Sequence, residues 1–463
     1  MSNQNIFAEL IAICGKENVS NQELDRIVYS SDLASLPPLI RQMYKIQQPQ
    51  YIVRPSTTGQ ISKIIKLAVQ HKIPFTTRAG ASTGNGAVIP IDGGIILDLT
   101  QMQKIIKIDP DFYQITVQPG IPWEKLNHFL KKNKLMIGIH PSSSPSATVG
   151  GFISTGGYAG IGAPKYGPIA QQIQKLKVIL PDGSISDIYP PLSSLFVGAE
   201  GTLGIIVEIT LQVFPLSQKI SPFAFGFADI ESASYFLQTI LAQGVKPYHV
   251  MLFDRHFLDL SKSLGLEVPK NEFLLILALE GTEETIQAES EKIWETISDK
   301  NKLNEKFAYD EWNKRFKAEL FIKRAGPSLI LLEVGISLSK INHLYKNFKE
   351  ISETQQIDLG FCGILGHNAT MLCMPFMLTD ERNGMDYLKI LTFSRRLLSN
   401  AIKHGGTLYG VGLWGSSYLP YLHSQEKLRI FREIKTLRDP ENLCNPGKII
   451  DDRTPERMKP PKP

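Results

Sequence analysis

Cysteine is scarce in this sequence of 463 residues. The four cysteines, Cys14, Cys362, Cys373 and Cys444, form no CxxC pair and have no metal-site spacing. This distribution argues against a disulfide framework and against an iron–sulfur cluster held by this chain. Any cluster that the protein works with must therefore belong to a partner.

Long apolar runs and long basic runs are lacking as well. The most apolar stretches, 273–279 and 329–334, have the length of a strand, so the sequence predicts no membrane-spanning helix. The N-terminal stretch lacks the pattern of a secretory signal. We therefore expect a cytoplasmic protein that reaches a membrane, if at all, through a partner complex. The 50 basic and 45 acidic side chains give a net charge of +5 without a basic run, which argues against nucleic-acid binding.

The length and the hydrophobic content of 43% suit two packed domains of an α+β protein. The pattern divides the chain into five parts. They are a helical lead-in at 1–45, a first domain at 46–217, a second α+β domain at 218–400, a segment at 401–450 that returns to the first domain, and a proline-rich tail at 451–463 that is flexible or bound to a partner.

Apolar spacing predicts the elements of both domains. In the first domain, a helix at 61–71, capped by residues 56–58, lies between two short strands and suggests a βαβ unit. The other helices are expected at 6–14, from 21, at 123–132, 231–243, 283–300, 339–353 and 385–403, and further strands at 174–180, 202–210, 211–214, 272–280 and 328–337.

The first glycine-rich segment, TTRAGASTGNGAVIP at 76–90, directly follows a predicted strand. Its small residues let the backbone approach a ligand, and successive exposed N–H groups form a nest for an anion such as pyrophosphate. It is not the GxGxxG motif of a Rossmann fold, because the strand leads into a long loop and further strands rather than into a helix. Taken alone, a phosphate loop and a structural turn are equally good interpretations.

Two further segments rich in small residues strengthen the prediction of a cofactor site. The segment at 140–167 is enclosed by strands, which favours a loop shaped around a ligand over a flexible linker. So much glycine costs conformational entropy unless a flat, rigid object lies against the backbone. The segment VGAEGTLGIIVEITL at 197–211 is a glycine turn that feeds a strand. Together the three segments predict a cofactor more strongly than any one of them.

The order of these motifs resembles a known family. The segments PSTTGQI, RAGASTGNGA, HPSSSPSATVGG, KYG, LPDGS, VGAEGTLGII and DPENLCNPGKI follow one another as in the FAD-binding vanillyl-alcohol-oxidase and p-cresol-methylhydroxylase (PCMH) superfamily. Within it, the chain looks most similar to glycolate-oxidase-like and D-lactate-dehydrogenase-like flavoprotein subunits. The resemblance covers essentially the whole chain and is strongest at 50–215. It implies an α+β, PCMH-type FAD-binding fold of two subdomains, an α+β cap domain and a C-terminal segment that covers the flavin.

The resemblance also assigns FAD contacts. It places the pyrophosphate against 78–86, the ribityl chain and isoalloxazine against 141–157, the adenosine half near 198–204, and closes the flavin with 445–448. The residues so assigned are Pro55, Arg78, Ala79, Gly80, Ala81, Ser82, Thr83, Gly84, Asn85, Gly86, Pro141, Ser142, Ser146, Thr148, Gly150, Gly151, Ser154, Gly156, Gly157, Tyr166, Gly167, Glu200, Gly201, Gly204, Ile205, Ile206 and Asn445.

Some relatives attach FAD covalently, through a histidine in the first glycine segment or a cysteine in the second. Residues 76–90 and 141–167 contain neither residue type. His140 borders the second segment, and we interpret it as a structural or solvent-facing histidine. We therefore expect FAD to be bound non-covalently.

The acid/base half of the family pattern is altered. Where 2-hydroxy-acid dehydrogenases of the family carry Glu-His-Gly, this chain reads GGTLYGVGLWGSSY, so Val411 and Gly412 take the places of the metal-binding Glu and the basic His. Neither residue can bind a metal or accept a proton. The histidine-rich strand of the family is reduced to LGHNATMLCMP, which keeps only His367. A structural role is the alternative for this histidine, and we expect no metal site.

Three residues are our catalytic candidates. Arg315 follows Trp312 by three residues, as does the family arginine that binds the substrate carboxylate; a surface arginine is the alternative. His367 and Tyr409 are candidates for handling one proton, as is Tyr418, although a tyrosine is a poor base unless its pKa is lowered.

Two further residues are open to interpretation. Trp414 either fills the substrate cavity or belongs to the core. Glu333, in LLEVGIS, replaces an acidic residue of the family and is interpreted as a structural pairing residue.

The resemblance implies an FAD-dependent dehydrogenase that oxidises a small 2-hydroxy acid of the glycolate or D-lactate type, by hydride transfer to flavin. Electrons would leave through a separate iron–sulfur subunit, and the protein could form an oligomer. The alternative is a flavin-bearing electron-transfer subunit of a larger complex without its own hydroxy-acid site. The altered Val411-Gly412 motif favours the alternative, and Arg315 favours the enzyme. An inactive scaffold protein is a third hypothesis. The many glycines assigned to FAD contacts argue against it.

Overall fold

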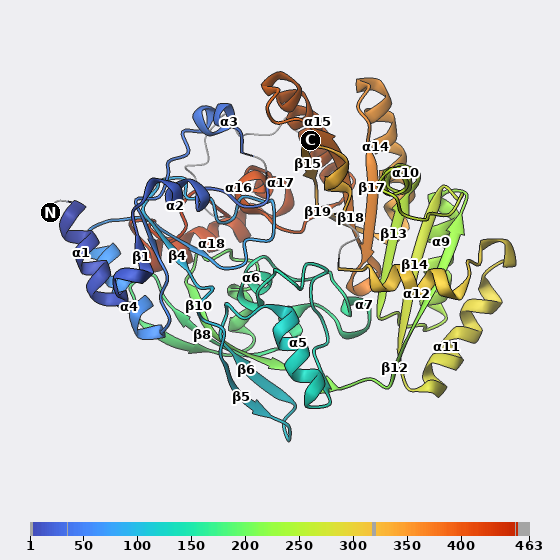
Figure 1. The fold of residues 1–463 in the computed structure, drawn as a ribbon, viewed down its shortest axis with the longest axis horizontal. Helices are drawn as coiled ribbons and strands as arrows, with labels where there is room; N and C mark the ends of the chain where they lie inside the picture. Colours follow the sequence, from blue (N-terminus) through green and yellow to red (C-terminus); the bar gives the residue numbers. More distant parts are fainter. Residues whose placement is uncertain (1–2, 35, 317–320, 450, 452–463) are drawn as a thin grey trace.

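The computed structural model describes residues 3–34, 36–316, 321–449 and 451, which form two domains side by side (Figure 1). The first contains the N-terminal half of the chain, and the second is built on one large sheet. The C-terminal elements, red in Figure 1, lie against the blue N-terminal elements rather than beyond the second domain. The two ends of the chain therefore build the first domain together.

The first domain begins with a small sheet in the order β1-β2-β4-β3, in which β2, β4 and β3 are parallel. The helix α4 connects β2 to β3, and a capping box between Thr57 and Gln60 fixes its start. The predicted helix and its two strands are present, but β4 lies between those strands in the sheet. The bounds are β1 Val19–Ser20, β2 Tyr51–Val53, α4 Thr58–Gln70, β3 Phe75–Arg78 and β4 Ile95–Asp98.

A second, antiparallel sheet in the order β5-β6-β10-β8-β9 forms the other half of this domain. Trp123 and Leu126 of α5 and Phe152 of α6 pack with its inward residues, such as Ile115 and Ile209, in one buried cluster. The bounds are β5 Ile105–Asp109, β6 Gln114–Val117, α5 Trp123–Lys132, β7 Leu135–Met136, α6 Val149–Ser154, α7 Ala163–Tyr166, α8 Ile169–Gln172, β8 Ile173–Ile179, β9 Ile185–Ile188, β10 Ile205–Gln212 and β11 Phe214–Pro215.

The second domain is an eight-stranded sheet in the order β12-β14-β13-β17-β18-β16-β19, with β15 also paired to β18. Alternate residues of β14 enter different cores: Leu275 and Leu277 pack with α9 and α14, whereas Leu274 and Ile276 pack with α10 and α12. Helices thus cover both faces. The strand bounds are β12 Lys219–Phe227, β13 His249–Asp254, β14 Phe273–Gly281, β15 Ser328–Leu331, β16 Val334–Ser337, β17 Gly360–Leu365, β18 Thr370–Thr379 and β19 Thr407–Leu408.

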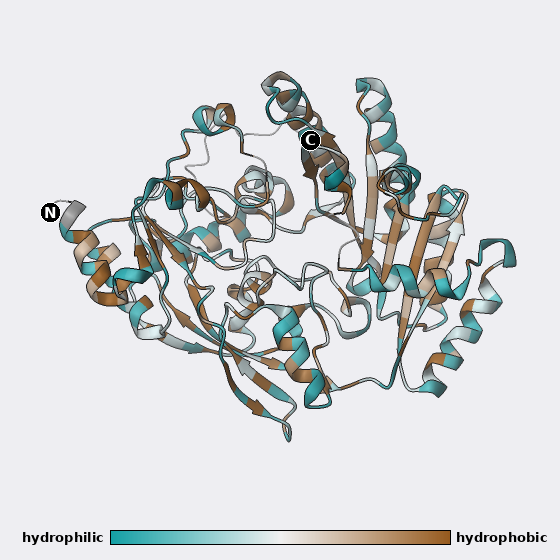
Figure 2. Ribbon diagram, in the orientation of Figure 1, coloured by the Kyte–Doolittle hydropathy of each residue, from teal (hydrophilic) through white to brown (hydrophobic). Residues whose placement is uncertain are grey.

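The helices α9, α11, α14 and α15 of this domain fall close to the predicted ranges, whereas α10 and α12 were not predicted. The bounds are α9 Ile230–Ala242, α10 Arg255–Ser263, α11 Glu283–Thr296, α12 Glu305–Asn313, α14 Ile341–Gln355 and α15 Gly384–Lys403. Figure 2 shows the strands largely brown and the outer faces of α11 and α14 largely teal, as expected for helices that bury one face against a sheet. No helix among the described residues combines the length and the apolar character that crossing a membrane requires.

The single strand predicted at 328–337 is in fact two strands, β15 and β16, and this prediction was wrong. Both pair with β18 in one register, at Leu331 with Phe376 and at Val334 with Cys373. Between them the N–H of Leu332 still donates to the Pro375 carbonyl at 3.0 Å, but residues 332–333 belong to neither strand. The carbonyl of Glu333 instead accepts the N–H of Tyr409 at 3.2 Å. This bond continues the register in which β16 pairs with β19.

The C-terminal segment is joined to the first domain by buried hydrogen bonds. The Nζ of Lys435 donates to the carbonyls of Thr202 and Cys444, both at 2.8 Å, and pairs with Asp439 at 2.6 Å. The backbone of Phe75 exchanges hydrogen bonds with Leu443 and Asn445. The bounds are α16 Gly412–Gly415, α17 Leu419–Leu422 and α18 Gln425–Arg438. The predicted return of this segment is thus visible in its contacts.

The lead-in consists of three helices, α1 Asn3–Cys14, α2 Glu23–Val28 and α3 Pro38–Met43. The first packs on α4, and Leu10 of α1 is fully buried there. The sequence predicts α1 and a helix from 21, close to α2, but not α3. Ile40 and Tyr44 at the end of this lead-in are buried against Tyr387 and Leu413 of the second half.

Candidate functional site: a cavity between the glycine loops and the second domain

A cavity of about 440 Å³ opens where the two domains meet. Its wall combines the three glycine-rich segments of the first domain with β15 and α15 of the second domain and with residues 408–418 of the C-terminal segment. This volume lies within the range of sites that bind small molecules and cofactors.

The first glycine loop offers a row of backbone donors to this cavity. Within the described residues, the N–H groups of 80–84 have no protein acceptor, and Ala81 adopts a positive φ of 46°. The loop is held at its ends, because Gly86 N–H donates to Asp32 at 2.7 Å and the Thr83 carbonyl accepts the N–H of Leu33 at 3.1 Å. Successive unpaired N–H groups are costly unless an anion or water accepts them, so this loop fits a phosphate-bearing ligand.

Several glycines of these segments are explained by packing within the protein. A Cβ on Gly80 would come within 2.6 Å of the Ser146 carbonyl oxygen, and one on Gly150 within 2.5 Å of Pro119. A Cβ on Gly201 would meet no atom closer than 3.8 Å, although this residue has a φ of 72°. The glycines thus serve two purposes, since some let protein segments meet and others leave the wall open toward the cavity.

A cluster of buried charges lies around the same loop. Burial raises the pKa of Glu200 to about 7 and that of Asp32 to about 6. Burial lowers the pKa of Lys448 to about 8 and lowers that of Arg78. The Lys448 ammonium opposes the shift of Glu200, and the Arg78 guanidinium opposes that of Asp32. These four charged groups are close enough to influence one another's pKa, so a bound anionic ligand would change the pKa of each of them.

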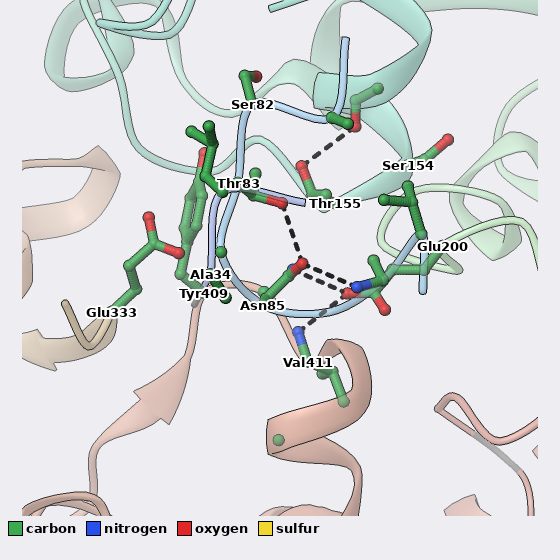
Figure 3. A pocket seen from close by; sticks show the side chains of 18 of the residues that line it. Ala34, Ser82, Thr83, Asn85, Ser154, Thr155, Glu200, Glu333, Tyr409 and Val411 are labelled. Atoms are coloured by element: carbon green, nitrogen blue, oxygen red, sulfur yellow. Dashed lines mark hydrogen bonds between the residues drawn. The ribbon is translucent and has the colours of Figure 1, made fainter. Parts of the chain in front are cut away.

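The altered segment at Val411-Gly412 is packed tightly against this cluster. The Glu200 carboxylate accepts the N–H of Val411 at 3.0 Å (Figure 3). It also accepts the N–H of Gly412 at 2.8 Å. Gly412 has a φ of 53°, and a Cβ there would overlap the carbonyl oxygen of Asn85. A side chain at position 412 is therefore excluded in this conformation. Asn445 braces the same region, since its Nδ2 donates to the carbonyls of Ala87 and Glu200 at 3.0 and 2.6 Å.

The wall opposite the glycine loops is mostly apolar and contains one carboxyl group. Figure 3 shows Glu333 beside the ring of Tyr409, which stands between it and the loop carrying Thr83. The Tyr409 hydroxyl donates to the carbonyl of Ala159 at 3.2 Å, and its ring lies 4.8 Å from that of Tyr158. The neighbouring wall residues are Leu329, Leu331, Ile364, Leu372 and Met374.

The cavity brings together most of the residues predicted to contact the cofactor. Those that line it are Arg78, Ala79, Gly80, Ala81, Ser82, Thr83, Gly84, Asn85, Pro141, Ser142, Thr148, Gly150, Gly151, Ser154, Glu200, Gly201, Gly204, Ile205 and Ile206. Those that do not are Pro55, Gly86, Ser146, Gly156, Gly157, Tyr166, Gly167 and Asn445. Tyr166, for example, donates its hydroxyl to Glu280 at 3.0 Å, away from the cavity.

The three tentative catalytic residues are not brought together. Tyr409 lines the cavity, whereas Arg315 and His367 do not. The Arg315 guanidinium lies 4.3 Å from the ring centres of both Trp312 and Phe316, and it donates to the Trp312 carbonyl at 2.9 Å. His367 lies next to Gly167. Within the described residues, its Nδ1 is buried and has no hydrogen-bond partner. Among the described residues, no group of three His, Cys, Asp or Glu side chains could hold a metal ion.

His140 and Trp414 are placed clearly by the structure. His140 is buried, its Nδ1 lies 2.8 Å from the Ser144 hydroxyl, and burial lowers its pKa to about 4. It is therefore a neutral histidine inside the protein at physiological pH. Trp414 lines the cavity and also meets the ring of Tyr44 at 6.2 Å.

Sequence reasoning missed the part of the wall that comes from elsewhere in the chain. Leu33, Ala34, Ile40 and Tyr44 of the lead-in line the cavity, as does Arg395 of α15. The proline at the start of α3, followed by Ile40 and Tyr44 four residues apart, was a signal for a short helix with one buried face. Nothing local to Arg395 indicates which face of α15 meets the cavity.

Two families match this chain. Residues 49–189 match the family described as FAD binding domain, and residues 217–449 match the family described as FAD linked oxidases, C-terminal domain. The glycolate oxidase subunit GlcD of Bacillus subtilis is 28% identical over 97% of both chains. The mitochondrial D-lactate dehydrogenase [cytochrome] of Arabidopsis thaliana is 25% identical over 87% of this chain and 73% of that protein.

Solved structures share the fold at lower identity. p-Cresol methylhydroxylase, in a crystal structure with substrate bound, superposes with a TM-score of 0.83 and 19% identity over 97% of both chains. The 4-ethylphenol oxidase of Gulosibacter chungangensis superposes with a TM-score of 0.80 and 17% identity over 98% of this chain and 99% of that one. These similarities establish the PCMH-type fold.

Proposed function

Because the chain belongs to the FAD-linked oxidase family and is an FAD-dependent oxidoreductase of the glycolate oxidase and D-lactate dehydrogenase type, we propose that it oxidises a 2-hydroxy acid in the cavity between its domains. One observation carries this proposal. The glycine loops with their free N–H groups and a wall bearing Glu333 and Tyr409 belong to a single cavity.

The residues around the glycine loops fit FAD. In our proposal the N–H groups of 80–84 bind the diphosphate, and the segment from Pro141 to Gly151 lies along the flavin. The buried Thr77 hydroxyl faces this cavity without a protein partner, which leaves it able to bond a cofactor atom. Neither segment contains a histidine or cysteine that could attach the cofactor, so the proposed binding is non-covalent. When bound, FAD supplies the acceptor for the hydride of the substrate.

We assign the proton of the substrate hydroxyl to the Glu333 carboxylate. Among the described residues of the cavity wall, the carboxyl groups are those of Glu200 and Glu333. The Glu200 carboxylate is already engaged by two backbone N–H groups of the C-terminal segment. The Tyr409 hydroxyl donates its one hydrogen to the carbonyl of Ala159. We choose Glu333 because it lies beside Tyr409 on the wall opposite the glycine loops, and because a carboxylate accepts a proton at neutral pH, where a tyrosine is protonated.

Electrons leave the reduced protein, in our proposal, through a separate redox partner that holds an iron–sulfur cluster. The similarity to a protein named as a subunit of glycolate oxidase supports a partner, and none of the four cysteines lies near another in a cluster motif. Location in the cytoplasm, with membrane contact only through that partner, is part of the same proposal.

A second function remains a candidate because of the segment at Val411-Gly412. If the cavity holds FAD but admits no hydroxy acid, the protein would relay electrons within a larger complex. The packing of Gly412 under Asn85, which leaves no room for a catalytic side chain, favours this alternative. The presence of Glu333 on the cavity wall favours the enzyme.

An anaerobic absorbance titration separates the two functions. The oxidised-flavin band of the purified yellow protein is followed while glycolate, D-lactate and larger 2-hydroxy acids are added. Bleaching supports the dehydrogenase, and a band that only dithionite or a redox partner removes supports the electron-transfer subunit. A colourless protein that takes up no FAD contradicts both.

The role of Glu333 is tested by Glu333→Gln, which keeps the shape and removes the base. We expect the rate of flavin reduction at saturating substrate to fall about 100-fold or more, since general bases contribute factors of this size. The control is Glu353→Gln, at an exposed position on α14. Equal reduction rates in the wild type and Glu333→Gln would show that another group takes the proton.

A further inference from the structure

Arg395 is a guanidinium in the cavity wall without an acidic partner. It lies on α15 and is half-buried, and its Nη2 donates to the Tyr44 hydroxyl at 2.6 Å. In the part of the chain that the structure describes, no carboxylate lies within ion-pair distance of it. An arginine has five donor hydrogens in a planar fork, so most of its donors here are left for a ligand or for water.

Three other cations at or near the cavity, Arg315, Arg78 and Lys323, each lack a feature that Arg395 has. The Arg315 guanidinium is stacked against Trp312 and Phe316 outside the cavity wall. Arg78 lines the cavity, but it belongs to the glycine loop and donates to the Ser31 carbonyl at 2.5 Å. Lys323 also lines the cavity, yet it is an exposed and flexible point charge. Arg395 is therefore the best placed of these groups to bind an anion at a defined position.

The surroundings of Arg395 combine this charge with apolar surface. Tyr387 and Leu391 of the same helix, Ile330 of β15 and Trp414 of α16 line the same cavity. The Tyr44 hydroxyl accepts a hydrogen bond from Arg395, so its own hydrogen can be donated to a bound anion. A small acid such as glycolate would reach few of these apolar side chains, whereas an acid with a bulky apolar body would bury them.

We propose that Arg395, with Tyr44, forms the carboxylate-binding subsite of the substrate cavity, and that the substrate is a 2-hydroxy acid with a bulky apolar or aromatic side chain. The inference deepens the proposed function and rests on it for the reaction. The planar guanidinium binds the carboxylate through two parallel hydrogen bonds, and the apolar side chains around it contact the rest of the acid. Specificity for the acid thus comes from α15 of the second domain and from the N-terminal lead-in, not from Arg315.

The test measures binding separately from turnover. The first probe is 3-phenylpropionate, an acid with no hydroxyl to oxidise, and its dissociation constant is read from the change in the flavin spectrum and by calorimetry. We expect Arg395→Met to raise this constant at least tenfold and Arg395→Lys, which keeps the charge but not the fork, to raise it at least threefold. Arg396→Met, at the exposed neighbouring position on α15, is the matched control and should leave it unchanged.

The second probe is the oxidation of D-phenyllactate compared with its neutral counterpart, 3-phenyl-1,2-propanediol. The wild type should prefer the acid, and Arg395→Met should lose the preference through a higher KM rather than a lower kcat. Binding of 3-phenylpropionate that depends on Arg395, without bleaching by any hydroxy acid, would leave the subsite standing and overturn the proposed function. Bleaching and binding that are unchanged in both Arg395 variants, or lost in Arg315→Met instead, would overturn the subsite. If Arg395→Met retains no FAD, the Arg395→Lys comparison decides.

Discussion

The close contact between Gly412 and Asn85 of the first glycine loop predicts that a single methyl group added at position 412 weakens FAD binding. In Gly412→Ala the new Cβ would overlap the carbonyl oxygen of Asn85, and the residue would have to keep a φ of 53°. The left-handed conformation costs about 1–2 kcal/mol for a residue with a Cβ, and forcing an atom into packed surroundings costs about 1–3 kcal/mol more. The segment must then move away from the loop that we propose for the FAD diphosphate.

The assay is the dissociation constant of FAD, measured by calorimetry on the apoprotein, together with the unfolding temperature of the holoprotein. If the steric part of the cost falls on the bound state, about 1–3 kcal/mol corresponds to a constant raised roughly 5- to 150-fold. Gly244→Ala is the matched control, because Gly244 has a φ of 83° and nothing within 4 Å of an added Cβ. The control carries the conformational cost without the steric one.

The reasoning fails if the two variants behave alike. Gly244→Ala should lose a little stability and keep the FAD affinity of the wild type, since it follows α9 in the second domain. A Gly412→Ala protein with unchanged affinity would show that the C-terminal segment can move from Asn85 without affecting the loop. In that case packing would no longer explain why position 412 carries no side chain.

Two further predictions concern the cluster beneath the loop. Burial raises the pKa of Glu200 from 4.5 to about 7, so the folded state holds this proton more tightly than the unfolded state and stability falls as the pH rises from 4.5 to 7. In urea unfolding of the apoprotein, the stability of the wild type relative to Glu200→Gln should fall by roughly 3 kcal/mol over that range, and a constant difference would contradict the shift. Asn445→Ala removes two buried hydrogen bonds to the carbonyls of Ala87 and Glu200, so we expect a loss of about 1–3 kcal/mol in FAD binding. The same calorimetric titration of FAD measures this loss. An unchanged FAD affinity would show that the two hydrogen bonds of Asn445 do not support the cofactor site.

The glycine-rich segments could be predicted from sequence because their signal is local. Runs such as 76–90 have a composition that only a close backbone approach explains, and most helices follow from apolar spacing over 10 to 15 residues. The order of the motifs adds the family resemblance, which comparison with known proteins confirms. The fold class and the cofactor therefore needed no tertiary information.

The substrate side of the cavity could not be predicted, because it depends on contacts between distant parts of the chain. Tyr44 and Arg395 are 351 positions apart and meet through a hydrogen bond between their side chains. The place of Glu333 in the cavity wall depends on the pairing of β15 and β16 with β18 and of β16 with β19, which a continuous apolar run does not reveal. The Trp312 spacing singled out Arg315, but spacing within one helix end does not say whether a side chain faces a cavity or stacks on its neighbours.

The altered motif at Val411-Gly412 acquires a physical meaning from these contacts. The two residues contribute backbone N–H groups to Glu200, and this removes one of the two carboxyl groups on the described cavity wall from proton transfer. The described wall opposite the glycine loops carries the Glu333 carboxylate. It also carries the Arg395 guanidinium, which has no carboxylate within ion-pair distance among the described residues. In our proposal the substrate gives its hydroxyl proton to Glu333 and places its carboxylate on Arg395. The loss of the family's acid/base pair is thus compatible with hydroxy-acid oxidation, provided that the proton and the carboxylate are handled by residues at other positions of the chain.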